Sequence, residues 1–282
     1  MKKILAFIAV SFIVLLAACG GGESDKEETK NTEDEETTEI KIGASSTPHA
    51  EILEEAKPLL EEKGISLDIE QYQDFVFPND DLASGELDAN YFQHIPYLET
   101  TVEDTGEDLD YIAGIHIEPM GVYSKDIKSL DDIEEGTEVI LSRSVADHGR
   151  ILALFEKEGF IKLDEDVEKV DATVKDIVDN PKNLTFSADV DAATLPEMYF
   201  TEDNVLVAIN TNYAIGADLN PLEDALIIEG DESPYVNVVA VRSEDMEDEA
   251  LNTLVDVLHS EEIQDFILEK YEGAVVPVDE EK

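Results

Sequence analysis

A strand–helix–strand pattern near residue 40 constrains the fold of this 282-residue chain more than any other feature. Residues 39–44 alternate between apolar and polar, as a half-buried strand does, and residues 50–62 carry apolar side chains at helical spacing. Gly64 stands where glycine commonly ends a helix, and residues 65–72 alternate again. Because such a unit joins parallel strands by a right-handed crossover, we predict an α/β fold.

A second set of alternating elements occupies the middle of the chain. Its predicted strands are 137–141, 184–186, 205–209 and 225–229, its predicted helices include 173–178 and 192–199, and 142–149 is a predicted loop. Residues 109–123 are predicted to form a long strand or strand pair. Extended segments near 119–124 and 230–236 predict two crossings between two lobes. We expect residues 39–122 and 232–282 in lobe 1 and residues 123–231 in lobe 2, with a hinge and a ligand cleft between them.

The N-terminus has the pattern of a secretory signal peptide. Two lysines precede a run, residues 4–18, that is apolar except for Ser11 and too short for a transmembrane helix. Cys19, the only cysteine, follows small residues as in a bacterial lipobox, so we predict a signal peptide at 1–18 and acylation of Cys19. The alternative is an ordinary cleavage site with a chance cysteine. Residues 19–38 are predicted to be a disordered acidic tether, holding the protein on the extracytoplasmic face of the cell membrane.

The charge of the chain excludes one class of partner. Sixty-nine acidic residues against 19 basic ones give a net charge of −50. Nucleic acid is excluded because phosphate binding needs lysine and arginine. The same acidity suggests a saline or alkaline habitat, and no calcium-loop spacing supports a cation-binding role.

Motifs of covalent chemistry are missing from the sequence. The five histidines, at 49, 94, 116, 148 and 259, lack zinc-site spacing, and there is no nucleophile elbow, phosphate loop or dinucleotide fingerprint. We therefore expect a binding protein without catalytic residues, metal or cofactor. A secreted hydrolase that uses carboxylates and an adhesion lipoprotein stay open as alternatives.

Several residues could build a small-molecule site. The stretch 85–97 brings aromatic side chains together with polar ones, the composition of a ligand pocket wall. Arg150, near a helix start after Asp147, could hold a carboxylate, and Asn210 and Asn237 could bind an ammonium group. Each also has a structural alternative, such as a helix cap, a surface ion pair or a core amide. The remaining candidates, for which core packing is the alternative, are Tyr72, Phe75, Phe92, His94, Tyr97 and His116.

Runs distributed along the chain resemble one family, the NlpA-type lipoproteins of the methionine-binding kind. The runs are 43–53, 78–79, 85–97 with its Asp-Ala-Asn-x-Phe-Gln-His core, 116–124, 176–182, 209–214 and 235–237. The resemblance implies a periplasmic-binding-protein fold (type II-like) that delivers methionine to the permease and ATPase of an ABC transporter, as a monomer. It also implies that Phe92, His94 and His116 line the side-chain pocket, that Arg150 holds the carboxylate, and that Asn210 and Asn237 hold the amino-acid backbone.

The chain departs from the family pattern at three places. Phe75 stands where a tyrosine is usual, Ser142-Arg143-Ser144 replaces Pro-Asn-Asp, and Asp147 replaces an asparagine. A carboxylate at 147 would repel a ligand carboxylate or attract an additional amine. Methionine is therefore the first expectation, with a methionine dipeptide or another amino acid as the alternative.

Overall fold

The larger of two main sheets contains the predicted strand–helix–strand unit. The computed structural model describes residues 37–230 and 233–278. The strands of this sheet are β1 (Thr38–Ser45), β2 (Ile65–Tyr72), β3 (Ala89–His94), β4 (Leu109–Ile117), β12 (Val236–Arg242) and β13 (Val276–Pro277). Their order is β13-β4-β12-β3-β1-β2. β1 is parallel to β2 and β3, as predicted, whereas β12 is antiparallel to β3 and β4.

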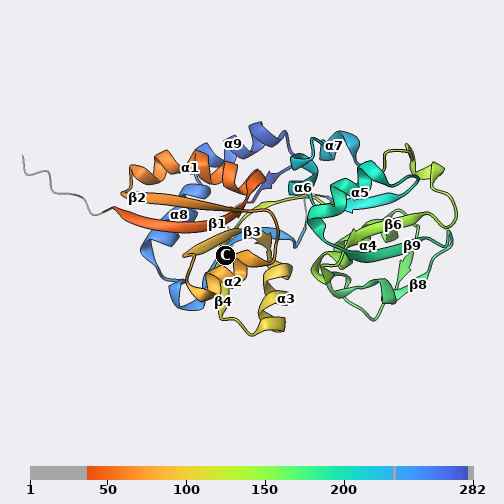
Figure 1. Ribbon diagram of the computed structural model, residues 1–282, viewed down its shortest axis with the longest axis horizontal. Coiled ribbons are helices and arrows are strands. Elements are labelled where there is room, and N and C mark those ends of the chain that lie inside the picture. Colours follow the sequence, from red (N-terminus) through yellow and green to blue (C-terminus); the bar gives the residue numbers. More distant parts are fainter. Residues whose placement is uncertain (1–36, 231–232, 279–282) are drawn as a thin grey trace, which may run out of the picture. The chain divides into compact units, whose positions relative to one another are not determined.

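Helices cover both faces of this sheet (Figure 1). They are α1 (Glu51–Glu61), α2 (Phe77–Ser84), α3 (Ile95–Thr105), α8 (Glu249–Leu258) and α9 (Glu261–Tyr271). Successive side chains of a strand point to opposite faces. Val239 and Val241 of β12 accordingly pack with α1, α8 and α9, whereas Val238 and Ala240 pack with Leu82 of α2 and Leu98 of α3. The sheet is thus buried on both sides.

The smaller main sheet is also buried on both faces. Its strands are β5 (Gly121–Tyr123), β6 (Glu138–Ser142), β9 (Thr185–Val190), β10 (Leu206–Ile209) and β11 (Ile227–Ile228), in the order β11-β5-β10-β6-β9. Helix α4 (Val145–Lys157) packs on one face and α5 (Leu195–Thr201) and α6 (Thr211–Gly216) on the other. Every side chain of β10 is therefore in a core, which explains its unbroken apolar run.

Short elements complete the described part of the chain. A third sheet pairs β7 (Lys162–Leu163) with β8 (Ile177–Asp179). The remaining helical segments are η1 (Ser46–Ala50), η2 (Leu130–Asp132), η3 (Lys169–Asp171), η4 (Val174–Asp176), η5 (Ala192–Thr194), α7 (Pro221–Asp224) and η6 (Ser243–Asp245).

Two segments carry the chain between the main sheets. Glu118–Met120 lie between β4 and β5, and the second segment lies between β11 and β12, where residues 229–230 and 233–235 are described. The predicted α/β alternation is confirmed. Residues 109–123 contain two strands, β4 and β5, and these strands belong to different main sheets.

Two sequence predictions were wrong. The loop predicted at 142–149 ends early, because α4 begins at Val145, so Asp147 lies in the first turn of a helix. The helix predicted at 173–178 is only the turn η4, because Thr173 and Asp176 form a capping box and the next residues pair with β7 as strand β8.

Several expectations lie outside the described residues. These are the signal peptide, acylation at Cys19 and nearly all of the tether. In the part of the chain that is described, no helix has both the length and the apolar character needed to cross a membrane.

Candidate ligand-binding site

A pocket lies where the ends of strands from both main sheets meet. β3 ends at His94, β6 at Ser142 and β10 at Ile209, and each is followed by a helix. In α/β folds, ligands bind in the crevice beyond the carboxyl ends of such strands. The residues that line this pocket are Phe75, Phe92, Gln93, His94, Tyr97, Glu118, Asp147, Arg150, Asn210, Thr211, Asn212 and Asn237.

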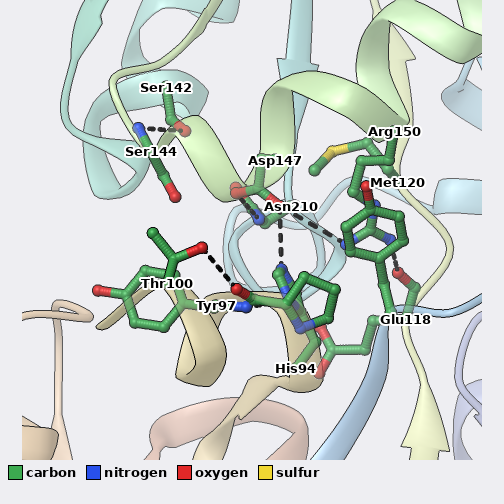
Figure 2. A network of polar contacts seen from close by, with 12 residues as sticks. His94, Tyr97, Thr100, Glu118, Met120, Ser142, Ser144, Asp147, Arg150 and Asn210 are labelled. Atoms are coloured by element: carbon green, nitrogen blue, oxygen red, sulfur yellow. Dashed lines mark hydrogen bonds and ion pairs between the residues drawn. The ribbon is translucent and has the colours of Figure 1, made fainter. Parts of the chain in front are cut away.

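Asp147 is the centre of a polar cluster that joins the two sheets (Figure 2). His94 Nε2, at the end of β3, is 3.1 Å from Asp147 Oδ1, and Asn210 Nδ2 donates to Asp147 Oδ2 over 3.2 Å. Because His94 Nδ1 accepts the N–H of Tyr97, the ring proton is on Nε2, which donates to Asp147. Burial would raise the pKa of Asp147. The pKa of Asp147 is instead lowered to about 2. The causes are the hydrogen bonds from His94 and Asn210 and the electrostatic attraction to His94 and Arg150.

Arg150 is buried, with 5 % exposure, and its guanidinium has acidic partners. Nε donates to Glu229 Oε2 over 3.1 Å, and Nη2 donates both to Glu229 Oε2 and to the carbonyl of Glu118. Nη1 lies 3.6 Å from Asp147 Oδ1, and the guanidinium carbon lies 4.4 Å from the ring centre of Tyr235. Arg150 is therefore not a surface charge, although it does have an acidic partner.

Glu118, which lines the pocket, belongs to a buried network with two histidines. Its Oε1 is 3.2 Å from His49 Nε2 and 3.0 Å from His116 Nε2, and its Oε2 accepts the N–H of Asn212. The outer ring nitrogens contact hydroxyls, His49 Nδ1 that of Ser45 and His116 Nδ1 that of Tyr91. Burial lowers the pKa of His49 to about 4 and that of His116 to about 3, so both rings are neutral at neutral pH. Burial raises the pKa of Glu118.

This same group is the candidate metal centre among the described residues. Ligand atoms of His49, His116 and Glu118 lie within 4.8 Å of one another. Two imidazoles and a carboxylate suit zinc or iron. Each of these residues has a hydrogen-bond partner: His49 Nε2 bonds Asn237 Oδ1, His116 Nε2 bonds Glu118 Oε1, and Glu118 Oε2 accepts the N–H of Asn212. The group is therefore complete as a hydrogen-bond network.

Aromatic rings form the other side of the pocket. Phe75 lies 5.9 Å from Phe92 and 4.9 Å from Tyr213, measured between ring centres, and Phe92 lies 6.0 Å from Tyr97. Behind β3, Gln93 exchanges hydrogen bonds with Asn79, which holds the end of the strand in place. The pocket thus has an apolar side suited to an aliphatic or thioether chain and a polar end.

The structure brings together most of the residues singled out in the sequence. Eight line the pocket: Phe75, Phe92, His94, Tyr97, Asp147, Arg150, Asn210 and Asn237. Tyr72 does not, because its hydroxyl turns away and donates to Asp81 over 2.5 Å. His116 is fully buried behind Glu118 rather than in the lining. Sequence reasoning missed Glu118, one acid among 69, whose signals were its place directly after an apolar strand and inside the run 116–124.

Comparison with known proteins identifies the family. The sequence model of the NlpA lipoprotein family matches residues 40–279. The chain belongs to the NlpA lipoprotein family. Its resemblance at the level of motifs is therefore confirmed over nearly the whole described region.

Members of the NlpA family and related solved structures support the fold. A methionine-binding lipoprotein of Bacillus subtilis (strain 168) is 46 % identical over 286 residues, covering 99 % of this chain and 100 % of the relative. A nutrient-binding protein from Burkholderia cenocepacia, solved bound to methionine, is 37 % identical with a TM-score of 0.80, covering 84 % of this chain and 99 % of that one. A periplasmic substrate-binding protein of an ABC transporter from Coxiella burnetii is 38 % identical with a TM-score of 0.80, covering 85 % and 100 %. The predicted two-lobed α/β binding-protein fold is confirmed.

Proposed function

We propose that this protein captures methionine, or a closely related amino acid, and delivers it to an ABC uptake transporter. The observation that carries the proposal is one pocket with an aromatic side and a polar end, built from both main sheets. The methionine-bound relative from Burkholderia cenocepacia, with the same fold at 37 % identity, supports methionine as the ligand.

The proposed roles follow the two sides of the pocket. Phe75, Phe92 and Tyr97 pack against the side chain of the ligand, and the groups around Asp147 hold its polar end. His94 Nε2 bonds Asp147 across the two sheets, so closing of the pocket is coupled to this contact. The protein returns its ligand unchanged, as a binding protein does, and no residue acts as a catalyst.

The lobes, the anchor and the partners belong to the same proposal. Lobe 1 comprises residues 39–122 and 232–282 and lobe 2 residues 123–231, although the pairing of β5 with β10 favours a first boundary nearer residue 120. Acylated Cys19 holds the protein, as a monomer, on the extracytoplasmic face of the membrane, where a permease with its ATPase receives the ligand. Relatives of this chain are named as lipoproteins and as a component of an ABC transporter, which supports a membrane-anchored protein that serves such a transporter.

The test is ligand-dependent thermal stability of the purified protein. L-methionine at 100 times its Kd stabilises a folded protein by about 2.7 kcal/mol, and for a chain of this size each kcal/mol raises the Tm by about 2–4 °C. Glutamate and lysine are expected to give no shift. Absence of a shift with L- and D-methionine would contradict the proposal.

A matched pair of phenylalanine variants tests the aromatic side. Phe92 lines the pocket, whereas Phe200 is 55 % exposed on α5. Truncation of a buried phenylalanine loses roughly 1.5–3 kcal/mol of apolar contact, so Phe92→Ala should weaken methionine binding by roughly 10- to 150-fold. Phe200→Ala should leave the affinity unchanged. Equal effects of the two changes, measured by calorimetry, would contradict this role of Phe92.

A further inference from the structure

Arg150 connects the pocket to both segments that run between the main sheets. Its Nη2 donates to the carbonyl of Glu118 in the first segment over 2.7 Å, and its Nε donates to Glu229 in the second over 3.1 Å. The ring of Tyr235, also in the second segment, has its centre 4.4 Å from the guanidinium carbon. The guanidinium is therefore oriented by the part of the chain in which the hinge is expected.

Glu229 is itself fixed by bonds to both segments. Its Oε2 accepts the N–H of Met120 over 3.1 Å, and its Oε1 accepts the hydroxyl of Ser233 over 3.0 Å. Its own N–H donates to the carbonyl of Met120 over 2.9 Å. Because both carboxylate oxygens are held, Glu229 in turn fixes one edge of the guanidinium of Arg150, the edge formed by Nε and Nη2.

Nη1 is the nitrogen of the guanidinium that remains for a ligand. The hydrogen bonds of Arg150 within the described residues come from Nε and Nη2, so the two N–H groups of Nη1 are unused there. Nη1 makes an ion contact with Asp147 Oδ1, but at 3.6 Å this contact is longer than a hydrogen bond. Since Arg150 lines the pocket, a ligand carboxylate can reach Nη1.

Asp147 competes with a ligand carboxylate for this nitrogen. Its side chain is ionised at neutral pH, because its pKa is lowered to about 2, and its Oδ1 is the oxygen in contact with Nη1. Charge-assisted N–H···O bonds are about 2.7–2.9 Å long, so a shift of Nη1 by less than about 1 Å would join it to Asp147. The asparagine that is usual in the family at this position carries no charge. The competition therefore follows from this chain's departure from the family pattern.

We propose that Glu229 is a positioning residue, which holds the guanidinium of Arg150 away from Asp147 and so leaves Nη1 open to the ligand carboxylate. Glu229 is not among the described residues that line the pocket, so it acts through Arg150. The second segment between the main sheets thereby takes part in ligand recognition, since it carries Glu229. The inference rests on the proposed function and names the residue that keeps Arg150 available to the ligand.

Two ligands with the same side chain test the inference by calorimetry on the full-length protein. L-methionine has the carboxylate and L-methionine amide lacks it, so the ratio of the Kd of the amide to that of methionine measures what the carboxylate contributes. A hydrogen bond to a charged group changes affinity by roughly 10- to 150-fold, and the wild-type ratio should lie in this range. In Glu229→Ala the ratio should fall by about 10-fold or more, because Nη1 then bonds Asp147.

The Asp147→Asn background separates positioning from a loss of structure. No carboxylate competes for Nη1 there, so adding Glu229→Ala should leave the ratio of that variant unchanged. If Glu229→Ala does not fold, Glu229→Gln takes its place. It keeps an acceptor but holds the guanidinium less strongly, so it should also lower the ratio, and Asp147→Asn should again cancel the effect. Glu223→Ala, at an exposed position of α7, is the matched control that should leave the ratio at its wild-type value.

The outcomes distinguish this inference from the proposed function. A ratio that stays constant or rises in Glu229→Ala would show that Glu229 only neutralises Arg150, and a ratio that falls equally in both backgrounds would show a merely structural role. Either result overturns the inference and leaves the proposed function standing. A wild-type ratio of about 1 would also overturn it, because Arg150 would then hold no ligand carboxylate. If methionine itself does not bind, the proposed function fails and the inference fails with it.

Discussion

Arg150 and Glu118 are both buried charges beside one pocket, yet their surroundings differ. Arg150 is in contact with the carboxylates of Glu229 and Asp147. Glu118 is surrounded by two imidazoles that burial keeps neutral and by a backbone N–H. A buried charge is tolerated when it is paired and is costly when it is not. The difference indicates that the charge of Arg150 is neutralised within the internal framework of the fold, whereas the carboxylate of Glu118 is held by uncharged partners.

The largest expected effect is the loss of stability on removing the guanidinium of Arg150. Arg150→Ala leaves Glu229 and Asp147 buried without their counter-charge, and breaking a buried pair in this way costs roughly 3–5 kcal/mol. Urea unfolding of the ligand-free protein measures the loss as a decrease in the free energy of unfolding.

A double variant is the control for this prediction. Arg150→Ala combined with Glu229→Gln also removes the unpaired carboxylate of Glu229, so the double variant should recover part of the lost stability. If Arg150→Ala alone costs less than about 1 kcal/mol, as an exposed ion pair would, then Arg150 is not a framework residue and is free to hold a ligand carboxylate.

The second prediction concerns the acid stability that Asp147 provides. The pKa of Asp147 is lowered from 3.8 to about 2, so the folded state holds its proton less tightly than the unfolded state does. Its contribution is fully present above the unfolded pKa and is lost as the pH falls through the folded one. A shift of this size corresponds to about 2 kcal/mol, lost between about pH 4 and pH 2.

Asp147→Asn isolates that contribution from the other acids of the chain. Asparagine retains an acceptor for His94 but does not titrate. The difference in unfolding free energy between the wild type and Asp147→Asn should therefore shrink as the pH falls from 4 to 2. A difference that is constant over this range would show that Asp147 is not held as an ion in the folded state.

The sequence was most informative where a residue pattern is compatible with only one kind of secondary structure. Alternation at 39–44 and 65–72 around a helical segment predicted β1, α1 and β2, because few other structures satisfy such spacing. The unbroken apolar run at 205–209 likewise predicted β10, which is buried on both faces. The pocket residues at 92, 94, 210 and 237 could be found because they lie in the family motifs given above, and Arg150 because it is an arginine near a predicted helix start.

The parts that could not be predicted depend on partners distant in the chain. Tyr72 was expected in the pocket, but the position of Asp81 nine residues later decides where its hydroxyl points. The pairing of Arg150 with Glu229 joins residues 79 positions apart, so it cannot be predicted from any local sequence pattern. Glu118 lies in the run 116–124 but is one of 69 acids in the sequence, and only the structure shows that its side chain is buried.

The smallest expected effect concerns Glu118 in the ligand-free protein. Burial raises the pKa of Glu118, so the folded state binds its proton more tightly than the unfolded state does. The cost of this carboxylate is absent below the unfolded pKa of about 4.5 and grows as the pH rises above it. Glu118→Gln should therefore be more stable than the wild type at pH 8, by about 1 kcal/mol, the scale of an incompletely satisfied buried polar group.

The pH dependence of this gain decides between two accounts of Glu118. If burial leaves the carboxylate incompletely satisfied, the advantage of Glu118→Gln should vanish toward pH 4. If the variant is instead less stable than the wild type at every pH, the two histidines and Asn212 already satisfy the charge. Glu118 would then be as much a framework residue as Arg150, and the contrast between them would disappear.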